Sequence, residues 1–146
     1  MLPGELVLAV IALGCTVAFG TVVHELTHAT VLRAYGIEYE LELFPTATGG
    51  TQFYGGICGA FATVTPQSIP ETTPVWGLRF AALAPLILTT PLLLVGAGVL
   101  PDPLSGTNGV LIAVTIGWFG CALPSPQDFS LFWHAETVIE QSQEVY

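Results

Sequence analysis

The sequence has little charge, and most of what it has is of one sign. It contains no lysine and only two arginines, Arg33 and Arg79, against eleven acidic residues, so its formal net charge is -9. Charged residues make up 9% of the chain, whereas a soluble domain carries roughly 25%. The shortage of basic residues excludes a nucleic-acid footprint, and the shortage of charge argues against a soluble enzyme. An acid-rich, lysine-free composition is typical of a protein in molar salt and favours a halophilic archaeal source.

Cysteine is scarce as well. Cys15, Cys58 and Cys121 lie far apart and form no CxxC pair, and their number is odd. This spacing argues against both a disulfide framework and a thiolate zinc site. Cys15 and Cys121 fall within apolar runs, where a free cysteine behaves as a small hydrophobic residue.

Apolar residues, in contrast, are abundant, at 52% of the chain with a mean hydropathy of +0.72. Three apolar runs are expected to be membrane spans, at about residues 5–35, 76–100 and 109–127. A span needs about 20 residues, and prolines inside such a helix are tolerated although they kink it. The sequence therefore predicts an all-α integral membrane protein with a three-span core, forming one domain over residues 1–146.

The segments outside these runs have their own patterns. Within the loop at residues 36–75, the segment 38–43 alternates polar and apolar residues, and 60–64 is a candidate partner strand. We expect a small membrane-associated β-hairpin there. Residues 129–141 read as an amphipathic helix on the membrane surface.

Both arginines flank the same loop, since Arg33 follows the first span and Arg79 opens the second. The positive-inside tendency places that loop in the cytoplasm of a cell-membrane protein. Three spans then put the N-terminus outside and the C-terminus in the cytoplasm. Whatever the orientation, the end of the first span and the end of the third must lie on the same side of the membrane.

The strongest motif lies at the end of the first span, where residues 24–28 read His24-Glu25-Leu26-Thr27-His28. The spacing i, i+4 places both imidazoles on one helix face, where both can bind one Zn²⁺. A metal in this position lowers the pKa of a water molecule to about 7, and the adjacent glutamate can take a proton from that water. Polar residues after 18 apolar ones are costly at membrane depth, which favours a functional role.

A catalytic zinc needs three protein ligands. We favour Asp128 as the third ligand, because it ends the third span on the same membrane side as the histidines. His134 and Glu136 lie further along and stay open as alternatives. Asp128 is also a candidate N-cap for a helix beginning at Phe129, and one residue can serve in both roles.

These motifs resemble a known family. Residues 19–37, with the HExxH motif inside them, are similar to the first core helix of site-2-protease-like intramembrane zinc metalloproteases. Ala84-Pro85 is similar to the Gly-Pro of that family's middle core helix. Residues 123–128 resemble the proline-rich approach to the family's Leu-Asp-Gly, whose aspartate is the third zinc ligand. The chain differs in having Phe129 where that motif has glycine, and a segment around Cys121 where the family has asparagine.

The resemblance implies a zinc-dependent, membrane-embedded endopeptidase that hydrolyses peptide bonds of membrane-protein or peptide substrates in or near the bilayer. His24, His28 and Asp128 would hold Zn²⁺, and Glu25 would act as general base. An exposed strand containing Leu41 and Leu43 is expected to bind the unwound substrate by β-addition.

Two other function classes stay open at this stage. The departures from the family pattern and the small size fit a zinc-binding membrane protein without proteolytic activity. Intramembrane His, Glu and Asp also mark ion pathways, so a transporter is a third reading. Three spans make a thin pathway unless the chain forms a homo-oligomer, a state that the sequence does not define.

Overall fold

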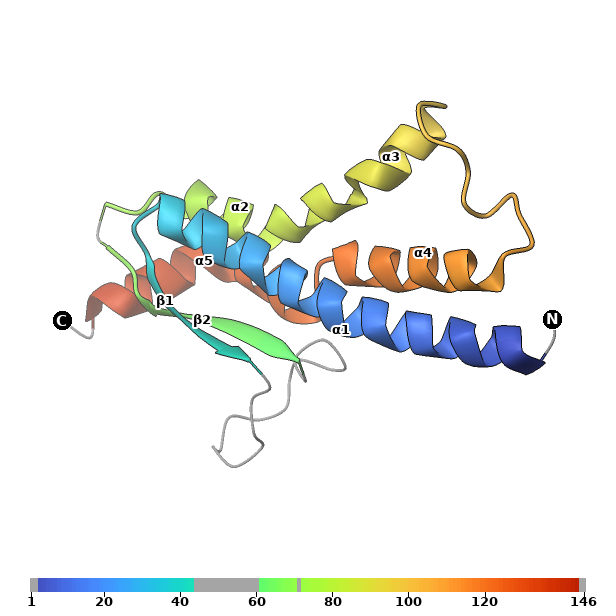
Figure 1. Cartoon of the computed structure of the whole chain (residues 1–146). Helices are drawn as coiled ribbons and strands as arrows, with labels where there is room; N and C mark the ends of the chain where they lie inside the picture. The colour runs from blue at the N-terminus through green and yellow to red at the C-terminus, as the bar shows by residue number, and fades with distance from the viewer. Residues whose placement is uncertain (1–2, 44–60, 71, 145–146) are drawn as a thin grey trace.

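The computed structural model describes residues 3–43, 61–70 and 72–144 of the 146-residue chain. The chain is mainly helical, with a small two-stranded sheet (Figure 1). Three stretches are long and apolar enough to cross a membrane, at Pro3–Ala34, Val75–Gly96 and Gly109–Gln143. The structure thus confirms three long apolar helical stretches and a small antiparallel sheet between the first two.

Helix α1 (Pro3–Ala34) runs along most of the molecule and ends in a defined turn (Figure 1). Gly36 adopts a positive φ of 68°, its N–H donates to Arg33 O, and the N–H of Ile37 donates to Leu32 O. This is a Schellman cap, in which a glycine supplies the left-handed residue that releases the chain from the helix. Leu32 and Ile37 are both buried in the core, so the cap also turns the chain toward the sheet.

Strands β1 (Glu38–Leu43) and β2 (Ala62–Ser68) form an antiparallel pair, in which Leu41 lies opposite Val64. The predicted strands are confirmed, although β2 continues to Ser68 rather than ending at residue 64. The glycine-rich connection at residues 44–60, which contains Cys58, lies outside the described residues.

The second apolar stretch is broken into three helical pieces. Helix α2 (Val75–Leu83) is followed by the 3₁₀ helix η2 (Ala84–Thr89) and then by α3 (Thr90–Gly96). Pro85 and Pro91 each stand near the start of a new piece, as expected of a residue that lacks an N–H and clashes with the preceding turn. Beyond the break, α3 diverges from the other helices (Figure 1).

The third stretch consists of α4 (Gly109–Ala122) and α5 (Pro126–Glu144). The sequence predicts a span to about residue 127 and a separate helix from Phe129, whereas the observed break lies earlier, at residues 123–125. Pro124 explains it, because a residue before proline disfavours helical conformation and Leu123 is extended, with ψ 139°.

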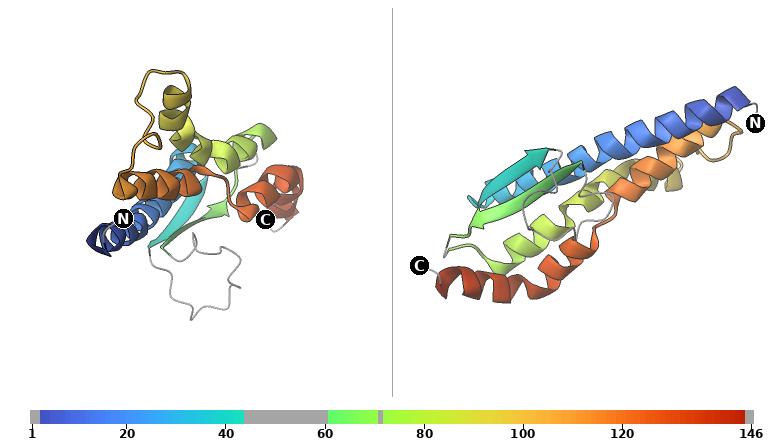
Figure 2. Two further views of the ribbon diagram at one scale, coloured as in Figure 1. Left: turned by 90° about the vertical axis from the view of Figure 1, so that its right-hand side faces the viewer. Right: turned by 90° about the horizontal axis from the view of Figure 1, so that it is seen from below.

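Helices α1 and α4 lie side by side, and small residues allow their close approach. A Cβ atom on Gly20 would lie 2.9 Å from the side chain of Cys121, and one on Gly117 would lie 3.1 Å from Leu13. At the other end of the molecule, the sheet, α2 and α5 gather around the last turns of α1 (Figure 2). The buried apolar core lies there, formed by Leu32, Ile37, Leu78, Ala81, Ala135 and Ile139.

Candidate metal centre

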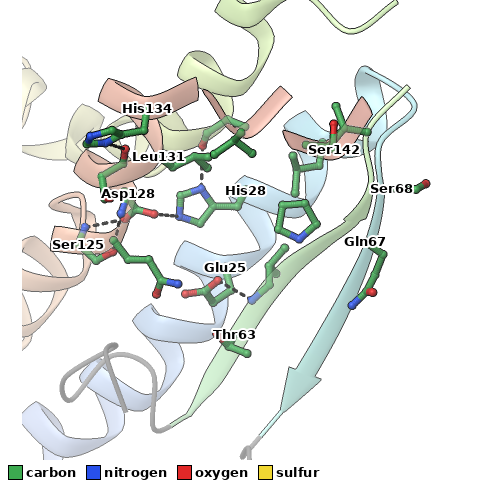
Figure 3. Close-up of a pocket in the computed structure, with 18 residues that line it drawn as sticks. Glu25, His28, Thr63, Gln67, Ser68, Ser125, Asp128, Leu131, His134 and Ser142 are labelled. Atoms are coloured by element: carbon green, nitrogen blue, oxygen red, sulfur yellow. Dashed lines mark hydrogen bonds and ion pairs between the residues drawn. The ribbon is translucent and has the colours of Figure 1, made fainter. Parts of the chain in front are cut away.

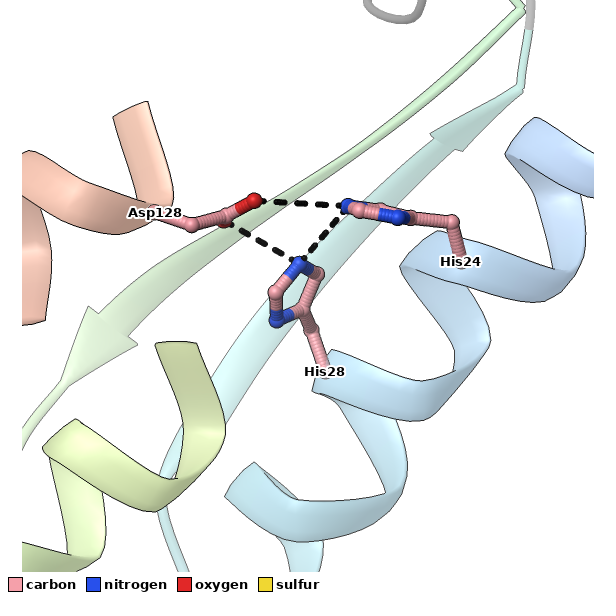
Figure 4. Close-up of side chains that lie close together, drawn as sticks. All are labelled: His24, His28 and Asp128. Carbon is pink, nitrogen blue, oxygen red and sulfur yellow. Dashed lines mark hydrogen bonds and ion pairs between the residues drawn. The ribbon is translucent and has the colours of Figure 1, made fainter. Parts of the chain in front are cut away.

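Two histidines project from one face of α1, where the helix passes from its exposed half into the packed end of the molecule. His24 is 3% exposed and His28 is 8% exposed. Their Nε2 atoms lie 3.2 Å apart, so the i, i+4 spacing brings the rings together as the sequence predicts (Figure 4).

Asp128 reaches these rings from the first turn of α5. Its Oδ1 lies 3.1 Å from His28 Nε2, and its Oδ2 lies 3.4 Å from His24 Nε2. A reciprocal capping box fixes the carboxylate, because Ser125 N donates to Asp128 Oδ2 at 2.6 Å and Asp128 N donates to Ser125 Oγ at 3.2 Å. Ser125 is therefore the N-cap residue and Asp128 the third residue of the helix, so the aspartate both caps α5 and faces the histidines.

Main-chain carbonyls hold the far side of each imidazole. His24 Nδ1 donates to Cys121 O, and His28 Nδ1 donates to Ala81 O, both at 2.7 Å. Since a carbonyl oxygen only accepts, each Nδ1 carries the proton of its hydrogen bond, which leaves Nε2 as the nitrogen that can offer a lone pair to a metal ion. When both Nε2 atoms are unprotonated, two nitrogen lone pairs and a carboxylate converge, an arrangement that a cation between them would stabilise.

The spacing of these atoms suits a small tetrahedral ion. Bonds of about 2.0–2.1 Å at tetrahedral angles separate ligand atoms by about 3.3 Å. The two Nε2 atoms lie 3.2 Å apart, close to that value, and each has an Asp128 oxygen at a similar distance, Oδ1 at 3.1 Å from His28 and Oδ2 at 3.4 Å from His24. Among the described residues, His24, His28 and Asp128 form a group that could hold a metal ion. Histidines that donate their second ring nitrogen to a carbonyl are typical of metal ligands.

Glu25 lies beside this group, at the inner end of a cleft. Its Oε2 accepts a hydrogen bond of 3.0 Å from the main-chain N–H of Val64 in β2. The cleft has a volume of about 570 Å³ and runs between β2 and α5, from Glu25 and Asp128 toward Ser68 and Ser142 (Figure 3). A carboxylate beside a potential metal site, facing an open cleft, is placed to exchange protons with a bound molecule.

The alternative third ligands lie elsewhere. His134 lines the cleft, and its Nδ1 is bonded to Ser130 O at 3.0 Å. Glu136 forms an exposed ion pair with Arg79 at 3.1 Å. The structure therefore brings Asp128, rather than His134 or Glu136, to the two histidines.

Leu41 and Leu43, predicted to bind substrate, lie in β1 with exposed fractions of 36% and 54%. The strand that lines the cleft is β2, through residues that include Thr63, Val64 and Gln67. Neither leucine is among the described residues that line the cleft. Their role in substrate binding stays a prediction.

Sequence reasoning missed the main-chain partners of the site, which are Cys121 O, Ala81 O and Val64 N. Main-chain atoms carry no residue-type signature, so no motif identifies them directly. An indirect signal does exist, because Pro85 and Pro124 stand just after two of them and interrupt the helices that would otherwise use those carbonyls.

No family model matches the chain, and no curated protein or solved structure is significantly similar to it.

Proposed function

We propose that this chain is a zinc-dependent, membrane-embedded endopeptidase. The observation that carries the proposal is the convergence of His24, His28 and Asp128, with Glu25 beside them at the inner end of a cleft. Nitrogen and carboxylate ligands in this number, with room for a further ligand, suit a catalytic zinc. The cleft between a strand and a helix has room for an extended peptide segment.

The membrane setting of the proposal rests on exposed apolar surface. Large apolar side chains along α1 are open, such as Leu6, Val7, Val10 and Ile11, each more than half exposed. Exposed apolar patches of this extent are expected against lipid and are rare on soluble monomers. The proposed orientation keeps the arginine-flanked loop, and with it the metal group, on the cytoplasmic side of the cell membrane.

The chemistry divides between the metal and the chain. Zinc, when bound, would polarise the scissile carbonyl and make water acidic enough to give a nucleophile at neutral pH. Glu25 would take a proton from the attacking water through its carboxylate as the water oxygen bonds to the carbonyl carbon. As the C–N bond breaks, Glu25 would return that proton to the leaving amine. The hydrogen bond from Val64 N keeps this carboxylate beside the metal group.

The first test measures zinc per chain in detergent-purified protein. We expect one zinc in the wild type and loss or strong weakening of binding in Asp128→Ala. Asp102→Ala provides a matched control, because Asp102 is the other aspartate of the chain and is exposed in the connection before α4. A wild type that holds no zinc without chelators present would overturn the metal centre.

The second test separates a peptidase from an inert zinc protein. We expect Glu25→Gln to keep its zinc but to lose cleavage of an unstructured peptide or a membrane-protein substrate by at least about 100-fold, the size of a general-base contribution. Cleavage that is equal in the wild type and Glu25→Gln, with zinc bound to both, would contradict the proposed mechanism.

A further inference from the structure

The two carbonyls that hold the histidine rings are available because of the helix breaks beside them. In an α-helix, the carbonyl of residue i accepts the N–H of residue i+4. The partner of Ala81 O would be residue 85, and Pro85 has no N–H. Ala81 O instead accepts Ala84 N–H, in the tighter 3₁₀ pattern, together with His28 Nδ1.

We propose that Pro85 is a positioning residue for the metal centre, because it leaves Ala81 O open to His28 Nδ1 and so directs His28 Nε2 toward Asp128. The inference rests on the proposed metal centre but not on peptidase activity. Pro85 is itself fully buried, and η2 begins at the preceding residue, so the break is fixed in the packed end of the molecule.

The break at Pro124 does the same for the other histidine. Helix α4 ends at Ala122, and Cys121 O accepts a hydrogen bond from His24 Nδ1. The released Ser125 N–H donates to Asp128 Oδ2. The helix end at Pro124 thus places an acceptor beside His24 and a donor beside Asp128, two of the candidate metal ligands.

Pro91 provides an internal comparison. It also lacks the N–H that would pair with a carbonyl four residues earlier, in this case Ile87 O. That carbonyl accepts the hydroxyl of Thr90 at 2.5 Å and makes no described contact with the metal group. Pro85 and Pro91 therefore each remove the main-chain N–H that would pair with an earlier carbonyl. Of these two carbonyls, only Ala81 O is bonded to a histidine of the metal group.

In a variant without proline at position 85, the main-chain N–H of residue 85 can donate to Ala81 O and so compete with His28 Nδ1. The His28 ring then loses its fixed partner, and its proton is no longer held on Nδ1. Since a proton on Nε2 blocks the ligand lone pair, zinc affinity falls by about 10-fold or more, the range measured for groups that orient metal ligands.

The experiment uses the full-length chain in detergent micelles, metal-free, with ¹⁵N-labelled histidine and at a pH above the ordinary pKa of imidazole. Signals are assigned with His24→Asn and His134→Asn variants. Ring ¹⁵N shifts report which nitrogen of His28 carries the proton, and a competing chelator measures zinc affinity. The variants are Pro85→Ala and Pro85→Val, of which the second keeps a side-chain volume close to that of proline, and the control is Pro91→Ala.

We expect His28 to be protonated on Nδ1 in the wild type and in Pro91→Ala, and to shift toward Nε2 protonation with weaker zinc binding in both Pro85 variants. Pro85 variants that match Pro91→Ala in tautomer and affinity would overturn the inference. Even if neither Pro85 variant folds, a wild-type His28 protonated on Nε2 would overturn the inference, because that ring could not donate to Ala81 O. A wild type without zinc affinity would overturn the proposed metal centre, while the tautomer shifts would still test the role of Pro85.

Discussion

The two halves of α1 are built for different surroundings. Among the described residues of α1 before Gly20, only Ala9 is buried, and large apolar side chains such as Leu8 and Phe19 are exposed. From Gly20 onward it buries Thr21, His24, His28 and other residues against α2, α4 and the sheet. Apart from the contact of Leu13 with Gly117 of α4, the first half therefore depends on overall apolarity, whereas the second half depends on individual side chains and on the main-chain groups that they meet.

The largest loss of stability is expected when a buried leucine at the packed end is shortened. Leu78 is fully buried in the core next to the metal centre, whereas Leu8 is 58% exposed on the open half of α1. Leu78→Ala should lower the free energy of unfolding by about 2–5 kcal/mol, because it removes packed atoms and leaves a cavity. Leu8→Ala should change it by less than about 0.5 kcal/mol. Thermal denaturation in one detergent measures both, and equal losses would show that the two halves do not differ in packing.

A smaller effect is expected where the halves meet. A Cβ atom at Gly20 would lie 2.9 Å from Cys121, whereas one at Gly14 has nothing within 4 Å. Gly20→Ala should therefore push α1 from α4 and cost about 1–3 kcal/mol, while Gly14→Ala should be neutral or stabilising. Because Cys121 O holds His24, Gly20→Ala should also weaken zinc binding. A Gly20→Ala protein as stable as Gly14→Ala would contradict this account of the contact.

The smallest effect is expected at the surface of the packed end. Glu136 forms an exposed ion pair with Arg79, so Glu136→Gln should cost less than about 1 kcal/mol. Its zinc content should stay at the wild-type value, because the proposed third ligand is Asp128, which lies beside both histidines. Loss of zinc from this variant, measured by metal analysis, would make Glu136 a ligand after all.

The sequence predicted those parts of the fold and site that depend on residue type and spacing. The apolar runs indicated the three long helical stretches, the alternation at residues 38–43 indicated β1, and the HExxH spacing paired His24 with His28. Asp128 followed from an argument about membrane sides, without any local motif that joins it to the histidines.

The remainder depended on main-chain geometry. The sequence pattern puts the start of α5 at Phe129, with Asp128 as a candidate cap, whereas the helix begins at Pro126 and Ser125 completes a capping box with Asp128. The carbonyls of Ala81 and Cys121 have the same chemistry as every other carbonyl of the chain. Only the positions of the helix ends distinguish them, and helix ends are the features that a sequence pattern defines least well.

The separation of the ligands along the chain has a consequence for folding. His28 and Asp128 stand one hundred positions apart, and most of the molecule lies between them. An ion shared by these two residues would close that whole length into a ring, which removes conformations from the unfolded ensemble more than from the folded one. Removal of the metal by a chelator would open this ring. The metal-free protein should then be less resistant to heat and to proteolysis, even if no contact of α1 before Gly20 has changed.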